Sequence, residues 1–303
     1  MARIDYSDAA AAAFQAAREL PPDALSEWRA AISRHLAPRP GMRVLDLGAG
    51  TGTWATALAS WYGINVVAVE PSPAMRARSR WPGTLAGNAT ALPLAPATMD
   101  GAWLSTVVHH LPDLPAAARE LRRVLRPGAP VLIRGAFPGR HHGIGLFRYW
   151  PEAIAALDTF PSIAGVRTAF TAAGFSYVTL EPVRQVTAPS LAAIAATARR
   201  EAHTPLMLIS DEAYEAGLAR LRAAATTQPG PSSIPSTYSS CGPAAPPRPH
   251  LRRPAQPPTK TQNDQIGRGT GGRAGARMAA PIGGSRSHLT ATDSAPSGCA
   301  SRS

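Results

Sequence analysis

Short runs of apolar residues alternate along the chain with stretches in which apolar residues recur every three or four positions. The runs are typical of buried strands, and the second pattern is typical of helices that bury one face. Strands are predicted at about 43–47, 64–70, 84–87, 102–108 and 130–135, and helices between them at about 53–62, 73–80 and 113–125. Such alternation predicts an α/β fold with a doubly wound, mostly parallel sheet and helices on both faces.

The same patterns extend to either side of this core. Two helices are predicted before it, at 9–20 and 23–37. After the fifth strand, the glycine- and aromatic-rich segment 137–150 predicts a loop or a short irregular cap. The remaining predicted elements are a helix at 162–173, a sixth strand at 175–187, and helices at 190–202 and 210–225.

The pattern stops near residue 228. Residues 229–303 hold twelve of the 31 prolines and show no apolar periodicity. Because this composition buries too little surface to offset the entropy of ordering, the segment is predicted to be disordered. The chain is therefore predicted to divide into an N-terminal helical cap (1–40), an α/β domain (41–228) and a disordered Pro/Gly/Arg-rich tail (229–303).

The most informative motif joins the first predicted strand to the helix after it. Glycines at 48, 50 and 52 follow Asp46, and Glu70 ends the second strand. Glycines allow a tight turn and the close approach of a ligand, and the amides that open the next helix favour a negative group. A carboxylate at position 70 would accept hydrogen bonds from two neighbouring ribose hydroxyls. A dinucleotide-binding turn would need a third glycine at position 53, which is Thr53.

Five segments in order carry a family resemblance. Leu45–Gly52 resembles the first motif of the class I S-adenosylmethionine-dependent methyltransferases, and Val69–Ser72 resembles the second. Gly87–Pro93 resembles the loop that borders the adenine, Asp100–Ser105 the fourth strand, and Arg119–Gly128 the helix and turn before the fifth strand. The resemblance implies a Rossmann-like methyltransferase fold, with the S-adenosylmethionine-binding domain at 41–228.

The resemblance also implies roles for individual residues. The glycines would shape the methionine end of the site, Asp46 would hold the loop, and Ser105 would lie near the sulfur. Asn88 stands where the family usually has Asp, and its amide oxygen can still accept a bond from the adenine amino group. The predicted cofactor-binding residues are Asp46, Gly48, Ala49, Gly50, Gly52, Glu70, Pro71, Asn88, Ala89, Ser105 and Arg18.

Other candidate residues have competing interpretations. Arg18 could pair with the methionine carboxylate as a planar fork, or it could be a surface arginine on an alanine-rich helix. His110, and less readily His109, could be a general base where the substrate enters, since an unperturbed histidine titrates near neutral pH. Either histidine could instead cap the loop or face solvent. His141 and His142 are predicted to be solvated rather than metal ligands, and no metal is predicted.

Composition narrows the classes of function. Both cysteines, Cys241 and Cys299, lie in the last quarter, so a cysteine nucleophile or an iron–sulfur cluster is excluded before residue 241.

Of the formal charge of +12, the tail carries more than half, with nine basic and two acidic residues and a single aromatic, Tyr238. Nucleic-acid binding is therefore not predicted. The absence of a long apolar run or a secretory pattern predicts a cytoplasmic protein without a membrane span.

The family's sheet closes with a seventh, antiparallel strand between the fifth and the sixth. After the helix at 210–225 the sequence offers no run of branched apolar residues, so this strand is predicted to be missing. One hypothesis is a shift of reading frame near residue 226, which would make the tail an out-of-frame product. The alternative is a natural disordered extension.

The sequence as a whole predicts transfer of a methyl group from S-adenosylmethionine to a small molecule. The segment Ser105–Val108 resembles the methyltransferases of quinone and secondary metabolism rather than those of nucleic acid bases. Oxygen, nitrogen and carbon acceptors all stay open, as does the oligomeric state. One alternative is a protein that binds S-adenosylmethionine without turnover, either because the edge strand is lost or because binding is its role. Another is a nicotinamide oxidoreductase.

Overall fold

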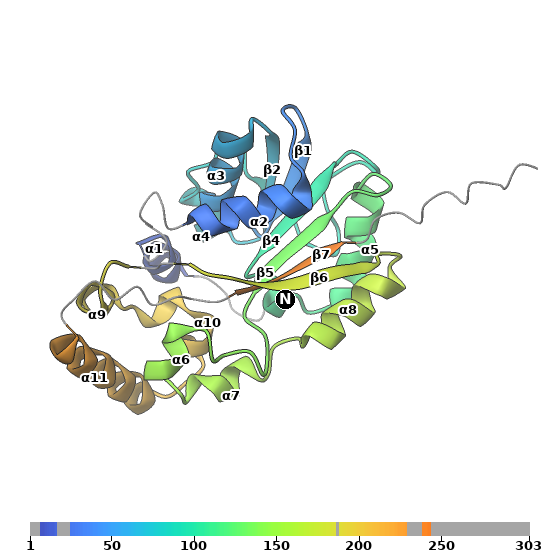
Figure 1. The fold of residues 1–303 in the computed structure, drawn as a ribbon. Coiled ribbons are helices and arrows are strands. Elements are labelled where there is room, and N and C mark those ends of the chain that lie inside the picture. Colours follow the sequence, from blue (N-terminus) through green and yellow to red (C-terminus); the bar gives the residue numbers. More distant parts are fainter. Residues whose placement is uncertain (1–6, 17–24, 186–187, 229–237, 244–303) are drawn as a thin grey trace, which may run out of the picture. The chain divides into compact units, whose positions relative to one another are not determined.

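The computed structural model describes residues 7–16, 25–185, 188–228 and the backbone of 238–243. Its centre is a seven-stranded sheet in the order β3-β2-β1-β4-β5-β7-β6 (Figure 1). The first five strands in the chain pair in parallel, and β7 is antiparallel to both of its neighbours. The strands are β1 (Arg43–Leu47), β2 (Asn65–Glu70), β3 (Leu85–Ala86), β4 (Gly101–Ser105), β5 (Val131–Gly135), β6 (Tyr177–Val183) and β7 (Tyr238–Pro243).

Helices follow the strands as the periodicity predicts. The α-helices are α1 (Asp8–Ala16), α2 (Ser26–Leu36), α3 (Thr53–Tyr62), α4 (Pro73–Ala77), α5 (Leu114–Val124), α6 (Gly145–Tyr149), α7 (Ala153–Leu157), α8 (Ile163–Ala172), α9 (Leu191–Thr197), α10 (Thr204–Met207) and α11 (Asp211–Thr227), and the 3-10 helices are η2 (Val108–His110) and η3 (Arg200–Ala202). Within the described ranges, no helix has the length and apolar character that crossing a membrane requires.

Alternation of side chains along the strands builds one core on each face of the sheet. On one face, Leu45 packs in a buried cluster that includes Leu121 of α5 and Phe170 of α8. On the other face, Val44 packs in a cluster that includes Ile32 of α2 and Leu58 of α3. Because successive residues of a strand point to opposite faces, a continuous apolar strand holds helices on both sides.

A third buried cluster forms a separate helical layer. We call this layer the helical cap; it is distinct from the N-terminal helical cap predicted for residues 1–40. It consists of α6, α7 and α9–α11, and its buried residues include Trp150, Leu157, Leu191, Leu206 and Leu221. The sequence predicts α9 and α11, although α9 ends at Thr197 rather than at residue 202. The segment 137–150, predicted as a loop or irregular cap, contains α6, and the short helices α7 and α10 were not predicted.

The prediction that the closing strand is missing is wrong. Residues Tyr238–Pro243 form β7 between β5 and β6, pairing with Ile133–Gly135 on one side and with Tyr177–Val183 on the other. A strand in this position is held by backbone hydrogen bonds to both neighbours, so it does not need a run of branched apolar residues. The predicted disorder of the rest of the tail concerns residues outside the described ranges.

Candidate functional site

A cavity of about 410 Å³ lies at the carboxyl ends of the parallel strands. Its floor comes from the ends of β1, β2 and β4, represented by Leu47, Glu70 and Ser105. The helical cap covers it with residues such as Phe147 of α6 and Leu206 of α10. Ligands of α/β proteins with open parallel sheets bind at this edge, and the volume lies within the range of small-molecule sites.

The glycine turn after β1 forms part of the cavity wall, which Gly48 and Gly50 line. Gly48 has a φ of +71° and donates its N–H to the carbonyl of Val69 at 2.8 Å. A Cβ at Gly48 would lie 2.4 Å from Cγ2 of Val107, so only glycine fits there. Gly50, with a φ of +56°, donates its N–H to Oε2 of Glu70 at 2.9 Å. The turn and the acidic end of β2 are therefore one hydrogen-bonded unit.

Glu70 is buried at the end of β2 and lines the cavity. Its Oε2 accepts the N–H of Gly50, and its Oε1 accepts the N–H of Ser72, both at 2.9 Å. Burial raises the pKa of this carboxyl above its ordinary value, and the two backbone N–H donors act against that rise. Since a carboxylate oxygen can accept two hydrogen bonds, each oxygen keeps one position for a ligand hydroxyl.

Asp46 lies beneath the turn, 1% exposed, and does not line the cavity. Burial, together with the nearby charge of Glu70, raises the pKa of Asp46 from 3.8 to about 7, and a hydrogen bond from the backbone of Ala55 opposes the rise. Its Oδ2 has no hydrogen-bond partner among the described residues. Asp46 is therefore bonded to the first turn of α3 and is not placed to contact a ligand in the cavity.

The raised pKa of Asp46 predicts a pH dependence of stability. Between pH 3.8 and about 7 the folded chain binds more protons at Asp46 than the unfolded chain does. Protonation of Asp46 therefore favours the folded state at low pH, and this contribution to the free energy of unfolding is lost as pH rises through that window. In Asp46→Asn the contribution is absent. We expect the difference in melting temperature between wild type and variant to change across this window, because the melting temperature of the wild type falls relative to that of the variant as pH rises towards 7. Parallel curves would contradict the assignment.

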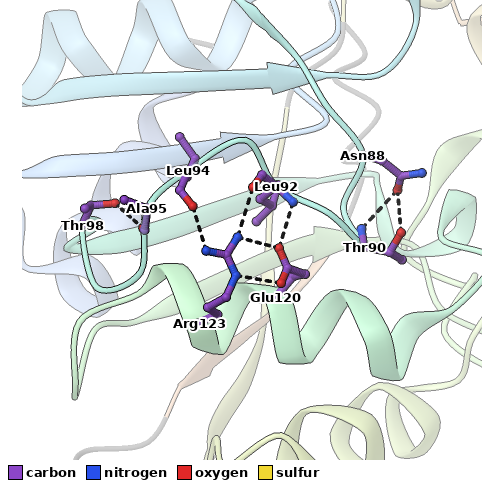
Figure 2. Close-up of polar contacts among 8 residues, drawn as sticks. All are labelled: Asn88, Thr90, Leu92, Leu94, Ala95, Thr98, Glu120 and Arg123. Carbon is purple, nitrogen blue, oxygen red and sulfur yellow. Dashed lines mark hydrogen bonds and ion pairs between the residues drawn. The ribbon is translucent and has the colours of Figure 1, made fainter.

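The loop after β3 is held by α5 on the side of the cavity next to Glu70. Arg123 donates to both carboxylate oxygens of Glu120, at 2.8 and 2.7 Å, and to the carbonyls of Leu92 and Leu94 at 3.0 and 2.8 Å (Figure 2). Glu120 in turn accepts the N–H of Leu92 at 2.9 Å. These bonds tie residues 92–94 to a helix of the core and so fix the loop that carries Asn88.

The orientation of Asn88 differs from the sequence prediction. Its Oδ1 accepts the backbone N–H of Thr90 at 3.1 Å and the Thr90 hydroxyl at 3.2 Å (Figure 2). Because a backbone N–H can only donate, the oxygen must face Thr90, and the NH2 group is the end that remains for a ligand. Asn88 lines the cavity, but it is arranged to donate a hydrogen bond rather than to accept one from an adenine amino group.

The two histidines after β4 differ in their packing. His109 is 8% exposed, and its ring stacks on Phe160 with centroids 4.3 Å apart and planes within 3°. His110 is less buried, and both line the cavity. His141 and His142 are not among the lining residues. Across the described residues, no three His, Cys, Asp or Glu side chains are grouped to hold a metal ion.

Most of the predicted cofactor positions meet at the cavity. Its lining contains Gly48, Gly50, Glu70, Pro71, Asn88, Ala89 and Ser105, together with the candidate base His110. Asp46, Ala49 and Gly52 do not line it. A Cβ at Gly52 would lie 2.8 Å from the Ser79 hydroxyl, so that glycine permits close packing rather than contact with a ligand. Arg18 lies outside the described residues.

Several lining residues were not predicted. Gln185 follows β6, Phe14 belongs to α1, and Thr204 opens α10. Phe147, Tyr149 and Trp150, for which a pocket and a packing role were both open, are buried in the helical cap and also line the cavity. These positions have no local motif, because tertiary packing alone brings them to the site.

The comparisons with known proteins agree with this geometry. The family described as "Methyltransferase domain" matches residues 45–133. A demethylmenaquinone methyltransferase of Corynebacterium kroppenstedtii is 38% identical over 108 residues, which are 35% of this chain and 47% of that protein. A malonyl-[acyl-carrier protein] O-methyltransferase of Erwinia pyrifoliae is 32% identical over 175 residues, 55% of this chain and 66% of that protein. The chain thus spans about half to two thirds of these curated relatives.

Solved structures share the fold at lower identity. A protein of an antibiotic biosynthesis pathway from Anabaena variabilis aligns with a TM-score of 0.62 and 20% identity, covering 72% of this chain and 97% of its own. Phosphoethanolamine N-methyltransferase 2 of Haemonchus contortus, solved with S-adenosyl-L-methionine, aligns with a TM-score of 0.52 and 20% identity, covering 81% of this chain and 59% of its own.

Fold, motifs and relatives together define the class. The chain carries a class I S-adenosylmethionine-dependent methyltransferase domain, as its sequence predicts. Within that class, the chain is similar in sequence to methyltransferases named for demethylmenaquinone and for malonyl-[acyl-carrier protein].

Proposed function

We propose that the chain transfers a methyl group from S-adenosylmethionine to a small-molecule acceptor. The observation that carries the proposal is the unit formed by the glycine turn and Glu70 at the cavity floor. Gly50 holds one oxygen of the Glu70 carboxylate and Ser72 holds the other, so the carboxylate is fixed in the cavity wall. A fixed carboxylate with two remaining acceptor positions suits the paired hydroxyls of a ribose.

The residues present fit S-adenosylmethionine in size and chemistry. The cavity encloses about 410 Å³, and Gly48 and Gly50 line it without side chains, so a ligand can approach the backbone of the turn closely. Asn88 would border the adenine and offer it a hydrogen-bond donor, Pro71 and Ala89 would pack beside it, and Ser105 would lie at the methyl end. When bound, the cofactor supplies a methyl group on a positively charged sulfur, which is already a good electrophile.

The protein's own task is then to position the acceptor and exclude water. Phe147, Tyr149 and Trp150 line the cavity on the side of the helical cap, where their apolar rings would exclude water. His110 is the proposed general base for an acceptor that must lose a proton, because it lines the cavity and histidine titrates near neutral pH. His109 is held against Phe160 and is the weaker candidate.

Replacement of Glu70 tests the cofactor site. Glu70→Ala removes the ribose acceptor and should weaken binding of S-adenosylhomocysteine by roughly 1–3 kcal/mol, measured by calorimetric titration. Glu70→Gln keeps one acceptor oxygen, so its affinity for S-adenosylhomocysteine should fall less than that of Glu70→Ala. Glu215→Ala, which removes an exposed carboxylate of α11 outside the cavity, is the matched control. Unchanged affinity in Glu70→Ala would show that the cofactor site is placed wrongly.

A transfer assay tests turnover. The full chain is incubated with methyl-labelled S-adenosylmethionine and sets of phenols, carboxylic acids, amines and quinols, and the release of S-adenosylhomocysteine is followed. The proposal predicts release that depends on one class of acceptor and falls in Glu70→Ala. Cofactor binding without transfer to any acceptor would favour the alternative, a binding protein without turnover.

One comparison makes that alternative specific. The [4+2]-cyclase SpnF shares the fold with a TM-score of 0.50 and 21% identity, so the fold by itself does not determine methyl transfer. The sequence-based reason for inactivity, a missing strand, no longer holds because β7 closes the sheet. The cytoplasmic location, the lack of a nucleic-acid partner, the domain boundaries and the reading-frame shift stay predictions.

A further inference from the structure

A buried arginine lies directly behind the cavity wall. Arg134 of β5 is 1% exposed and is not itself a lining residue. Its Nη1 donates to Oγ of Ser105 at 3.1 Å, and its Nη2 donates to Oε1 of Gln185 at 2.8 Å. Its guanidinium carbon also lies 5.1 Å from the ring centre of Trp28. Two nitrogens of one guanidinium therefore hold two side chains of the cavity wall.

The chemistry of the donors fixes the orientation of both side chains. Arginine and tryptophan side chains donate hydrogen bonds and accept none. Oε1 of Gln185 receives a bond from Arg134 and a second one, at 3.1 Å, from Nε1 of Trp28. The amide of Gln185 can therefore adopt only one orientation, in which its oxygen faces the arginine. In the same way, Oγ of Ser105 acts as an acceptor towards Arg134 and keeps its own proton for another partner.

What remains unused are hydrogen-bond donors. The described residues provide no acceptor for the Ser105 hydroxyl proton or for the NH2 group of Gln185. Both side chains line the cavity, Ser105 at the end of β4 and Gln185 after β6. Arg134 adds a positive charge behind them, in a buried setting where charges interact more strongly than in water.

On the basis of the proposed function, we propose that Ser105 and Gln185 form a paired donor site for an anionic oxygen of the bound ligand, with Arg134 as the positioning residue. A carboxylate is the simplest group that accepts from both donors at once. It could come from the amino-acid part of the cofactor or from the methyl acceptor. The chemistry is the same in both cases, and two arms of one experiment separate the sources.

Gln185→Glu is the sharpest variant for this test. It keeps an oxygen for Arg134 and Trp28, but it replaces the NH2 donor with a second acceptor that repels an anion. Ser105→Ala removes the other donor, and Ser105→Thr retains a hydroxyl. Gln228→Glu adds the same charge at the end of α11, outside the cavity, and is the matched control. Circular dichroism and melting curves confirm that each variant is folded.

The cofactor arm compares S-adenosylhomocysteine with 5′-methylthioadenosine, which lacks the amino-acid carboxylate. The acceptor arm compares 2-naphthoate with 2-naphthalenemethanol on the protein loaded with S-adenosylhomocysteine. In one of the two arms, Gln185→Glu and Ser105→Ala should each lower the affinity for the carboxylate probe at least about tenfold. The affinity for the matching neutral probe should stay within about twofold of the wild-type value. Ser105→Thr should recover most of the loss, and Arg134→Lys, which lacks the two-nitrogen fork, should behave like Ser105→Ala.

The arm that responds identifies the source of the oxygen. If neither arm changes, or if the charged and neutral probes lose affinity equally, the paired donor site is wrong while the proposed function stands. A wild-type chain that is folded and binds neither S-adenosylhomocysteine nor 5′-methylthioadenosine contradicts the proposed function itself. The two failures are therefore distinguishable.

Discussion

Gly48→Ala is expected to destabilise the protein by about 3 kcal/mol and to lower its affinity for S-adenosylhomocysteine more than tenfold. Two effects combine at this position. An alanine at a φ of +71° costs about 1–2 kcal/mol, and its Cβ would lie 2.4 Å from Cγ2 of Val107, which adds about 1–3 kcal/mol of overpacking. Since Val107 also lines the cavity, its displacement would disturb the wall as well as the turn.

Gly41 provides the control for backbone strain alone. It has a φ of +84°, and a Cβ there would meet no atom within 4 Å. Gly41→Ala should therefore show only the conformational cost and should leave cofactor affinity unchanged. Combining Gly48→Ala with Val107→Ala should destabilise less than the sum of the two, because the steric clash is then relieved. Equal effects of Gly48→Ala and Gly41→Ala in urea unfolding would contradict the role of the clash.

Gly217→Ala is expected to destabilise the helical cap by about 2–3 kcal/mol, although alanine favours helices more than glycine does. A Cβ at Gly217 of α11 would lie 2.1 Å from Cδ1 of Trp150. The indole cannot easily move aside, because its Nε1 donates to the carbonyl of Tyr214 at 2.9 Å and the ring is buried. Trp150 lines the cavity, so its displacement should weaken acceptor binding more than cofactor binding.

Gly165 of α8 offers a matched comparison. A Cβ there would lie 3.5 Å from the Ser162 hydroxyl, an ordinary contact. Gly165→Ala should therefore be neutral or stabilising by up to about 1 kcal/mol, through helix propensity. Thermal unfolding of both variants distinguishes packing from propensity. Stabilisation by Gly217→Ala would show that Trp150 has room to move and that the cap is loosely packed.

The parallel core of the fold could be predicted from sequence because most of its strands and long helices contain several apolar residues at the spacing typical of that element. β1 and α3 have the predicted bounds, and the other strands and long helices of the core differ by a few residues. The short helices α7 and α10 contain five and four residues, which is too few for apolar periodicity to be recognised. β7 could not be predicted for a different reason, since the two strands beside it determine its place.

The candidate site also contains residues that could be predicted from local sequence and residues that only tertiary packing brings together. Glu70 and the glycines could be predicted because the turn that unites them is local, with Gly50 and Glu70 bonded across one β-α-β unit. Arg134 and Gln185 are bonded although they are 51 residues apart, and no spacing rule connects them. Asn88 lines the cavity, but the orientation of its amide depends on Thr90, whose two hydrogen bonds turn the amide oxygen away from its predicted use.

The most direct test of the central claim is calorimetric titration of S-adenosylmethionine into the full chain, which retains the segment that forms β7. The geometry of the turn and Glu70 predicts one site with micromolar affinity, together with comparable binding of S-adenosylhomocysteine. A folded chain that gives no binding heat with either compound, and no shift in melting temperature at millimolar concentration, would contradict the assignment of this cavity as a cofactor site.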